Sequence, residues 1–153
     1  MRKGLFVGTF DPFTIGHDAI VRRALLLFDE LVVGVGINEA KHPQATAEER
    51  VEAIRRLYAD VPRVSVTAYS GLTVDLAREC GAQFIVKGVR SLHDFDYERS
   101  QADLNRQLAG IDTVLLLAEP HLAAVSSTAV RTLQALGRDV SEWLPRAKVA
   151  SEK

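Results

Sequence analysis

The chain has 153 residues, and its 19 basic and 20 acidic side chains leave a formal net charge of −1. This length suits one domain with a substantial core, and 47% hydrophobic and 25% charged residues are ordinary values for a soluble globular protein. The near balance of charge argues against a nucleic acid polymer as partner, because such a binding surface depends on excess positive charge.

Cysteine content and hydropathy indicate the cellular compartment of the protein. Cys80 is the only cysteine, so no intramolecular disulfide forms, and we expect a small buried residue there rather than a nucleophile. No apolar stretch reaches about 18 residues and the N-terminus lacks a signal-peptide pattern, which predicts a cytoplasmic protein without a membrane span.

Apolar runs and amphipathic segments alternate along the chain. Strands are expected at residues 5–7, 31–37, 64–68, 84–86 and 113–118. Helices are expected from Gly16 to Phe28, from a capping box at Thr46 and Glu49 to Tyr58, at 72–80, at 94–109, and from Ser126 or Ser127 to Leu136, with a short turn at 140–144. Gly81, Gly110 and Gly137 mark the ends of three of these helices.

This alternation predicts an α/β fold: a single Rossmann-like doubly wound domain over residues 1–153, with a five-stranded parallel sheet and loosely ordered last few residues. Ligands of such sheets bind beyond the carboxyl ends of the strands, where the strand order reverses. The loops at 8–17, 38–42, 87–94 and 119–127 all follow strands and carry candidate anion ligands. We therefore expect these four loops to meet at one edge of the sheet.

The segment Gly8–His17 joins the first expected strand to the first expected helix. Gly16 lets a ligand approach the backbone closely, and the unpaired N–H groups of the helix start favour an anion. The His17 imidazole adds a directional donor at the same place. Taken alone, the segment is explained equally well by a plain turn with a capping histidine.

A second helix start, Val125–Arg131, carries the consecutive hydroxyls of Ser126, Ser127 and Thr128. Backbone N–H groups and side-chain hydroxyls together form a binding site for an anion. For this segment alone, ordinary serine capping is the better explanation.

Together the two segments resemble the H-x-G-H and I-S-S-T-x-x-R signatures of the nucleotidyltransferase superfamily. Thr14 stands in place of the first His, and Val125 in place of Ile. Other segments narrow the resemblance to the bacterial-type phosphopantetheine adenylyltransferases. These are Gly8–Pro12, Lys41, Glu48–Arg50, Lys87–Arg90, Asp94–Glu98, Asn105, and Gly137–Val140 leading to Leu144–Pro145.

This resemblance implies transfer of an adenylyl group from ATP to the phosphate of 4′-phosphopantetheine, which gives dephospho-coenzyme A and pyrophosphate, the penultimate step of coenzyme A synthesis. It also implies a magnesium-dependent homohexamer. No dedicated carboxylate cluster is evident in the sequence, so we expect Mg²⁺ to arrive on the phosphates of ATP.

The resemblance also assigns roles to residues. His17 would stabilise the transition state, with Lys41 and Arg90 completing the catalytic set. The ATP-binding positions would be Thr9, Phe10, His17, Gly88, Val89, Arg90, Glu98, Val125, Ser126, Ser127 and Thr128. The acceptor would contact Thr9, Lys41, Thr73 and Lys87.

The chain departs from the family pattern in two places. His121–Ala124 lacks the aromatic residue and Ser that relatives often carry, so nucleotide contacts there would use backbone groups. Lys87 stands where many members have Arg, which keeps the charge and loses bidentate geometry.

The helix at 94–109 is unusually polar, and we expect a partly polar subunit interface.

Other functions share parts of this pattern. A cytidylyltransferase or a nicotinate-mononucleotide-type adenylyltransferase would have both signatures and a different acceptor, and a nucleotide-binding module would have the fold without catalysis. Lys41, the Lys87–Arg90 loop and Tyr97-Glu98 favour the pantetheine enzyme, while His17 beside the hydroxyl motif argues against the module. His42, His93 and His121 lack ligand spacing with His17, which indicates surface or supporting positions rather than a zinc site.

Overall fold

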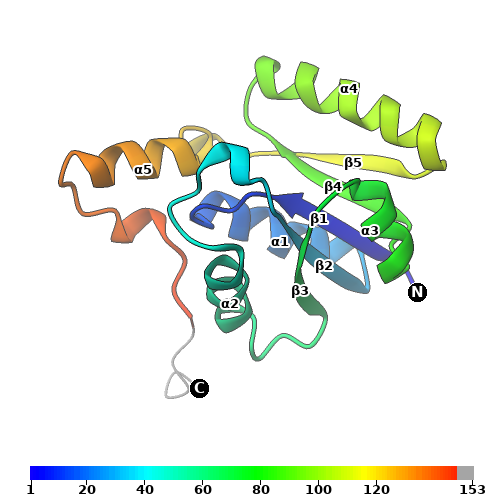
Figure 1. The fold of residues 1–153 in the computed structure, drawn as a ribbon, viewed down its shortest axis with the longest axis horizontal. Coiled ribbons are helices and arrows are strands. Elements are labelled where there is room, and N and C mark those ends of the chain that lie inside the picture. Colours follow the sequence, from blue (N-terminus) through cyan, green and yellow to red (C-terminus); the bar gives the residue numbers. More distant parts are fainter. Residues whose placement is uncertain (148–153) are drawn as a thin grey trace.

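The computed structural model describes residues 1–147, so the expectation about the last few residues lies outside the described part for 148–153. Its centre is one parallel sheet in the order β3-β2-β1-β4-β5. The strands are β1 (Lys3–Gly8), β2 (Glu30–Gly36), β3 (Val64–Tyr69), β4 (Phe84–Val89) and β5 (Asp112–Leu117). The predicted α/β class, with a five-stranded parallel sheet, is confirmed (Figure 1).

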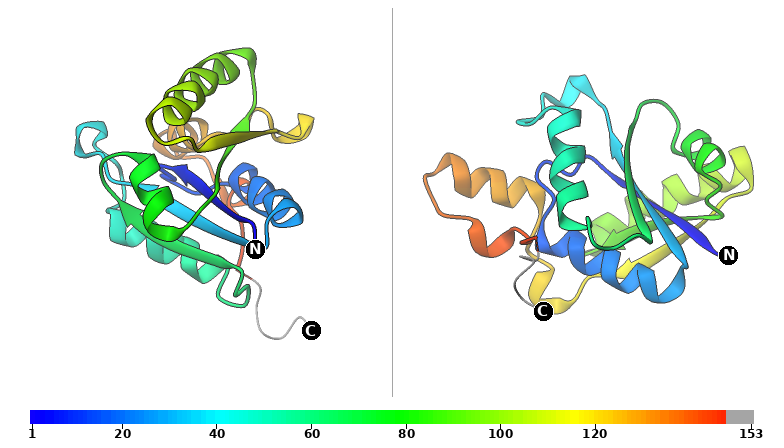
Figure 2. Two further views of the ribbon diagram at one scale, coloured as in Figure 1. Left: turned by 90° about the vertical axis from the view of Figure 1, so that its right-hand side faces the viewer. Right: turned by 90° about the horizontal axis from the view of Figure 1, so that it is seen from below.

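Helices cover both faces of the sheet (Figure 2). They are α1 (Ile15–Leu27), α2 (Ala47–Leu57), α3 (Thr73–Cys80), α4 (Leu92–Ala109) and α5 (Ser127–Ala135), with short 3-10 turns at Glu39–Lys41, Pro120–Leu122 and Ser141–Trp143. Side chains alternate along β1, so Phe6 packs under α1 and α2 while Leu5 and Val7 pack under α3. The near-continuous apolar character of β2 follows from burial on both faces.

The predicted helix boundaries are set by specific caps. Thr46 accepts a hydrogen bond from the Glu49 N–H at 3.1 Å, which is the first half of the expected capping box. Gly81 and Gly110 end α3 and α4 with φ of 72° and 68°, a left-handed conformation that glycine adopts at low cost. Their predicted role as helix stops is confirmed.

Three local predictions need correction. Strand β4 runs through Val89 instead of ending at residue 86, because Lys87, Gly88 and Val89 pair with Leu115–Leu117 of β5. Lys87 therefore lies on a strand and not in a loop. Helix α4 begins two residues early, since the Ser91 hydroxyl caps it by accepting from the Asp94 N–H. Cys80 is half-buried rather than buried.

Helix α4 has no buried side chain, although it packs on β4, β5 and α3. Several of its large apolar side chains are exposed, among them Phe95, Tyr97, Leu104 and Leu108. No helix within residues 1–147 is long and apolar enough to cross a membrane. The strand order reverses between β1 and β4, and α5 extends past the carboxyl ends of these central strands (Figure 1).

Candidate active site

Two adjacent cavities open at the carboxyl ends of the strands. The first, of about 300 Å³, lies where β1 and β4 meet the starts of α1, α4 and α5, and we call it the nucleotide cavity after the ligand expected there from the sequence. The second, of about 380 Å³, lies among the ends of β1 and β2, the start of α3 and one side of α4, and we call it the acceptor cavity, again after the ligand expected from the sequence. Val7, Gly8 and Lys87 line both. All four loops singled out from the sequence contribute residues to the walls of these two cavities, as expected for the carboxyl ends of the strands.

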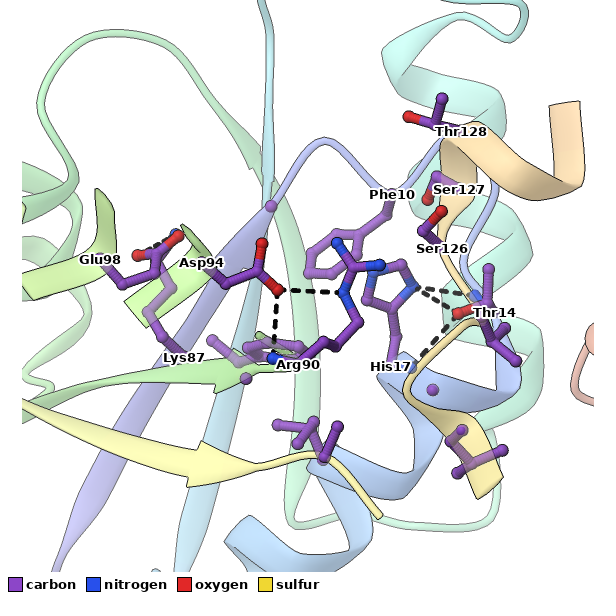
Figure 3. A pocket seen from close by; sticks show the side chains of 18 of the residues that line it. Phe10, Thr14, His17, Lys87, Arg90, Asp94, Glu98, Ser126, Ser127 and Thr128 are labelled. Carbon is purple, nitrogen blue, oxygen red and sulfur yellow. Dashed lines mark hydrogen bonds and ion pairs between the residues drawn. The ribbon is translucent and has the colours of Figure 1, made fainter. Parts of the chain in front are cut away.

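His17 lies in the first turn of α1 and faces the nucleotide cavity (Figure 3). The Thr14 N–H donates to its Nδ1 at 2.9 Å, and the Thr14 hydroxyl lies 3.2 Å from the same nitrogen. The Thr14 hydroxyl also caps the helix by accepting from the His17 N–H. Because Nδ1 accepts from a backbone N–H, the neutral ring carries its proton on Nε2.

Aromatic side chains surround the His17 ring. The ring centroids of Phe10 and Phe13 lie 5.0 and 5.3 Å from it, and Phe6 is 6.4 Å away. This burial, together with the positive charge of Arg90, lowers the pKa of His17 from 6.5 to about 4. At neutral pH His17 is therefore an uncharged hydrogen-bond donor.

Phe10, predicted as an ATP-binding residue, lines the nucleotide cavity with only 3% of its surface exposed. Its φ is 53°, a left-handed conformation that bulky residues rarely adopt. The ring lies edge-on to His17 at an interplanar angle of 87°. Phe10 therefore supports the imidazole, and contact with a nucleotide would come mainly from its backbone.

Arg90 follows β4 and is fixed by the start of α4. Asp94 accepts from the Arg90 backbone N–H at 3.1 Å and pairs with its guanidinium at 3.2 Å (Figure 3). Both residues line the nucleotide cavity. Asp94 was not among the predicted site residues; its i,i+4 spacing from Arg90 was the available signal.

The start of α5 forms the opposite wall of the nucleotide cavity, and its predicted hydroxyls are engaged with the protein. Ser126 accepts from the Ala129 N–H at 3.0 Å, and Ser127 donates to the Pro12 carbonyl at 2.7 Å. Thr128 accepts from Arg131 at 3.3 Å. These bonds fix the helix start against the β1–α1 loop. The first backbone N–H groups of α5 are therefore the main donors that this helix has for an anion.

The acceptor cavity brings together the four residues predicted to contact the acceptor. Thr9, Lys41, Thr73 and Lys87 all line it. The Thr73 hydroxyl lies 3.0 Å from that of Tyr69, and Lys41 is exposed at the end of its 3-10 turn. Thr9, also predicted to contact ATP, lines this cavity and not the nucleotide cavity.

Lys87 and Glu98 form an ion pair at the boundary of the two cavities, with Nζ 3.5 Å from Oε2 (Figure 3). Next to Lys87 in β4, Gly88 lines the nucleotide cavity, and a Cβ at this position would lie only 3.0 Å from Cγ1 of Ile20 in α1. Glu98, predicted as an ATP ligand, thus lies against the ammonium predicted to bind the acceptor.

The remaining predicted ATP-binding positions differ in whether they line a cavity. Val125 lines the nucleotide cavity, whereas Val89 is 5% exposed and lines neither cavity, and its carbonyl accepts from the Ala118 N–H. Leu122, from the segment that departs from the family pattern, is a buried part of the nucleotide-cavity wall. His121 is exposed and lies 3.5 Å from Glu119.

Chemically, the site combines a neutral imidazole donor, a guanidinium, two ammonium groups and a helix N-terminus around two joined cavities. This set suits a polyphosphate beside a second anion. Within residues 1–147, no three His, Cys, Asp or Glu side chains are grouped so as to hold a metal ion.

Comparison with known proteins identifies the group to which the chain is related. The model of the cytidylyltransferase-like family matches residues 5–133. The phosphopantetheine adenylyltransferase of Phocaeicola vulgatus is 57% identical over 145 residues, covering 95% of this chain and 96% of that protein. The enzyme of the same name from Bacteroides fragilis is 53% identical over 146 residues, covering 95% of this chain and 97% of its own length.

Solved structures agree on the fold. A bifunctional NMN adenylyltransferase/ADP ribose pyrophosphatase from Francisella tularensis superposes with a TM-score of 0.73 at 16% identity, covering 96% of this chain and 46% of that one. The resemblance inferred from the two signature segments is confirmed by the sequence relatives. The chain belongs to the phosphopantetheine adenylyltransferase family, within the cytidylyltransferase-like group.

Proposed function

We propose that this chain transfers the adenylyl group of MgATP to the phosphate of 4′-phosphopantetheine, forming dephospho-coenzyme A and pyrophosphate. The observation that carries the proposal is the shared wall between the cavities, where Lys87 borders both and His17 faces the nucleotide side. The identity of 57% to an enzyme of this name supports the choice of acceptor.

The reaction needs no general base, because the acceptor phosphate is already an anionic nucleophile. One of its oxygens forms a bond to the α-phosphorus of ATP as the bond from that phosphorus to the bridging oxygen of pyrophosphate breaks. The displaced electron pair leaves with pyrophosphate. Negative charge shifts toward the non-bridging α-oxygens and the leaving group, so catalysis is positioning and electrostatic stabilisation.

Each group has a place in this scheme. The Nε2–H of His17 donates to the α-phosphate, and the Thr14 N–H keeps that proton on the correct nitrogen. Lys41 and Lys87 hold the acceptor phosphate, while Arg90 and the start of α5 hold the ATP phosphates. The protein offers no carboxylate cage within its described part, which supports Mg²⁺ entering as part of MgATP, where it neutralises phosphate charge.

The proposal extends to a cytoplasmic homohexamer. Exposed apolar side chains on the mainly polar helix α4 support assembly, because mixed surfaces of this kind are typical of subunit interfaces. Light scattering of the purified protein measures the mass directly.

A panel of acceptors tests the reaction. Purified protein is incubated with MgATP and either 4′-phosphopantetheine, pantetheine without the phosphate, or nicotinate mononucleotide, and pyrophosphate release is measured. A parallel series replaces ATP with CTP. Strong release with ATP and 4′-phosphopantetheine alone supports the proposal, whereas preference for another pair identifies a different transferase. No release with any pair, by a folded protein that binds ATP, supports a non-catalytic module.

A further inference from the structure

Two charged side chains are buried outside both cavities. Asp11 is 5% exposed and Arg50 is 4% exposed, and neither lines the nucleotide or the acceptor cavity. Burying a charge is unfavourable unless hydrogen bonds replace its lost hydration. The partners of these two groups therefore show what they hold in place.

Asp11 lies in the β1–α1 loop and accepts bonds from a segment far along the chain. The Gln44 N–H donates to one carboxylate oxygen at 2.8 Å, and the Ala45 N–H donates to the other at 3.3 Å. Its own carbonyl accepts from Arg131 of α5. The carboxylate thus ties residues 44 and 45 to the same loop that leads to His17.

Arg50 lies in α2, and its guanidinium donates to backbone carbonyls. Its Nε donates to Ala45 at 3.2 Å, and one Nη donates to Thr9 at 2.6 Å and to Gly36 at 3.2 Å. Gly36 is the last residue of β2, and Thr9 directly follows β1. One guanidinium therefore links the ends of β1 and β2 to residue 45.

These bonds fix the two ends of one segment, residues 37–45, which carries Lys41 near its middle. The Gly36 carbonyl anchors the beginning, and residues 44 and 45 anchor the end. Between the anchors, Lys41 is exposed and faces the acceptor cavity from the 3-10 turn Glu39–Lys41.

We propose that Asp11 and Arg50 are positioning residues that clamp the 37–45 segment and so set the place of the Lys41 ammonium for the acceptor phosphate. The clamp acts on acceptor binding and not on the nucleotide cavity. This inference rests on the proposed function for its substrate, while its mechanical part, the fixing of the segment, is measurable without substrate.

Asp11→Asn is the informative variant because it keeps the side-chain shape. One amide oxygen still accepts, but the amide NH₂ faces a backbone N–H, so one of the two anchors at residues 44 and 45 is lost. We expect the KM for 4′-phosphopantetheine to rise about tenfold, with the KM for ATP and kcat changing less than about twofold. Asp29→Asn is the matched control: Asp29 accepts from the Arg2 N–H at the amino end of the sheet, away from both cavities.

A double-mutant cycle shows whether Asp11 acts through Lys41. If it does, Asp11→Asn has almost no further effect on the acceptor KM once Lys41→Ala has been introduced. An undiminished tenfold effect in the Lys41→Ala background overturns the proposal, as does an equal rise in the KM for ATP.

Limited trypsin digestion tests the clamp without any activity. Asp11→Asn increases the rate of cutting after Lys41, located by mass spectrometry, while Asp29→Asn does not. An unchanged rate overturns the clamp whatever the enzyme's substrate is, whereas faster cutting in a protein inactive with 4′-phosphopantetheine rejects only the proposed function. Should Asp11→Asn fail to fold, Arg50→Lys serves instead, because a single ammonium cannot reach all three carbonyls, and the same shift in acceptor KM and cutting rate is expected.

Discussion

The Thr14 backbone N–H and the Nδ1 of His17 are 2.9 Å apart, and this contact determines which ring nitrogen carries the proton. With Nδ1 occupied as an acceptor and the pKa lowered to about 4, the neutral ring presents Nε2–H to the nucleotide cavity. The cap of helix α1 and the orientation of the proposed catalytic donor thus depend on the same two residues. The predictions below follow from it and from the two cavities.

His17→Ala removes the proposed donor to the α-phosphate. We expect kcat to fall by about 10² or more, the usual effect of losing one preorganised transition-state donor, while ATP binding changes little. Steady-state kinetics and calorimetric ATP titration measure the two quantities. His93→Ala, at an exposed position of α4, is the control. Near-normal turnover in His17→Ala would refute the assigned role.

The lowered pKa of His17 makes the free energy of unfolding depend on pH in a definite direction. Above pH 6.5 the ring is neutral in both the folded and unfolded chain, so it contributes no pH dependence. Between pH 6.5 and about 4 the unfolded chain binds a proton that the folded chain does not, so the free energy of unfolding falls as the pH falls. The slope from this group is at most about 1.4 kcal/mol per pH unit.

Urea unfolding at several pH values measures this slope. His17→Gln removes this contribution and makes the curve less steep between pH 6.5 and about 4. In the same range the wild-type kcat shows no inflection from His17 above about pH 5, because the folded ring stays neutral. A kcat transition near pH 6.5 that disappears in His17→Gln contradicts this account.

Thr14→Ala separates helix capping from catalysis. Loss of the hydroxyl that caps α1 lowers the free energy of unfolding by about 1–2 kcal/mol, and Thr46→Ala, which uncaps α2, has an effect of similar size. The Thr14 N–H remains in place, so kcat falls only a fewfold in Thr14→Ala and not at all in Thr46→Ala. A loss as large as that of His17→Ala would show that the hydroxyl, and not the backbone N–H, fixes the imidazole.

Lys87 lies at the shared wall and is opposed by Glu98. Lys87→Ala is expected to raise the KM for the acceptor by about 10- to 100-fold, because a charge-assisted bond to phosphate is lost. Lys87→Arg retains the charge and should keep the acceptor KM within about threefold of wild type. Kinetics with each substrate varied in turn check this. Equal increases in both KM values in Lys87→Ala would place the ammonium on the nucleotide instead.

Much of the fold was predictable because burial on both faces makes an inner strand a short apolar run, as in Leu31–Val35 of β2. Strand β4 shows where this signal ends. Its first three residues are apolar and were recognised, whereas Lys87 and Gly88 line the cavities of the proposed site and therefore lack the pattern of a buried strand. The strand order also had no local signal, since β1 pairs with β4 across a long separation in sequence.

The proposed site was predictable where a motif carried it, as for His17 and Ser126–Thr128. The residues that hold the site in place were not predictable. Asp11 stood out only as part of the Gly8–Pro12 segment that carries the resemblance, and the partners that explain its burial, the Gln44 and Ala45 N–H groups, are backbone atoms that any residue type would supply. Arg50 likewise binds carbonyls of three separate segments, so no side-chain spacing in the sequence indicates its role.

The order of the elements along the chain also determines when the proposed site can first exist during synthesis. A nascent chain that ends at Cys80 already contains β1, β2 and β3 with Lys41 and Thr73, yet it lacks Lys87, Arg90 and the start of α5. Translation must pass α5 before the phosphate-binding walls can close. A prematurely terminated product therefore retains His17 without the groups that would bring ATP to it.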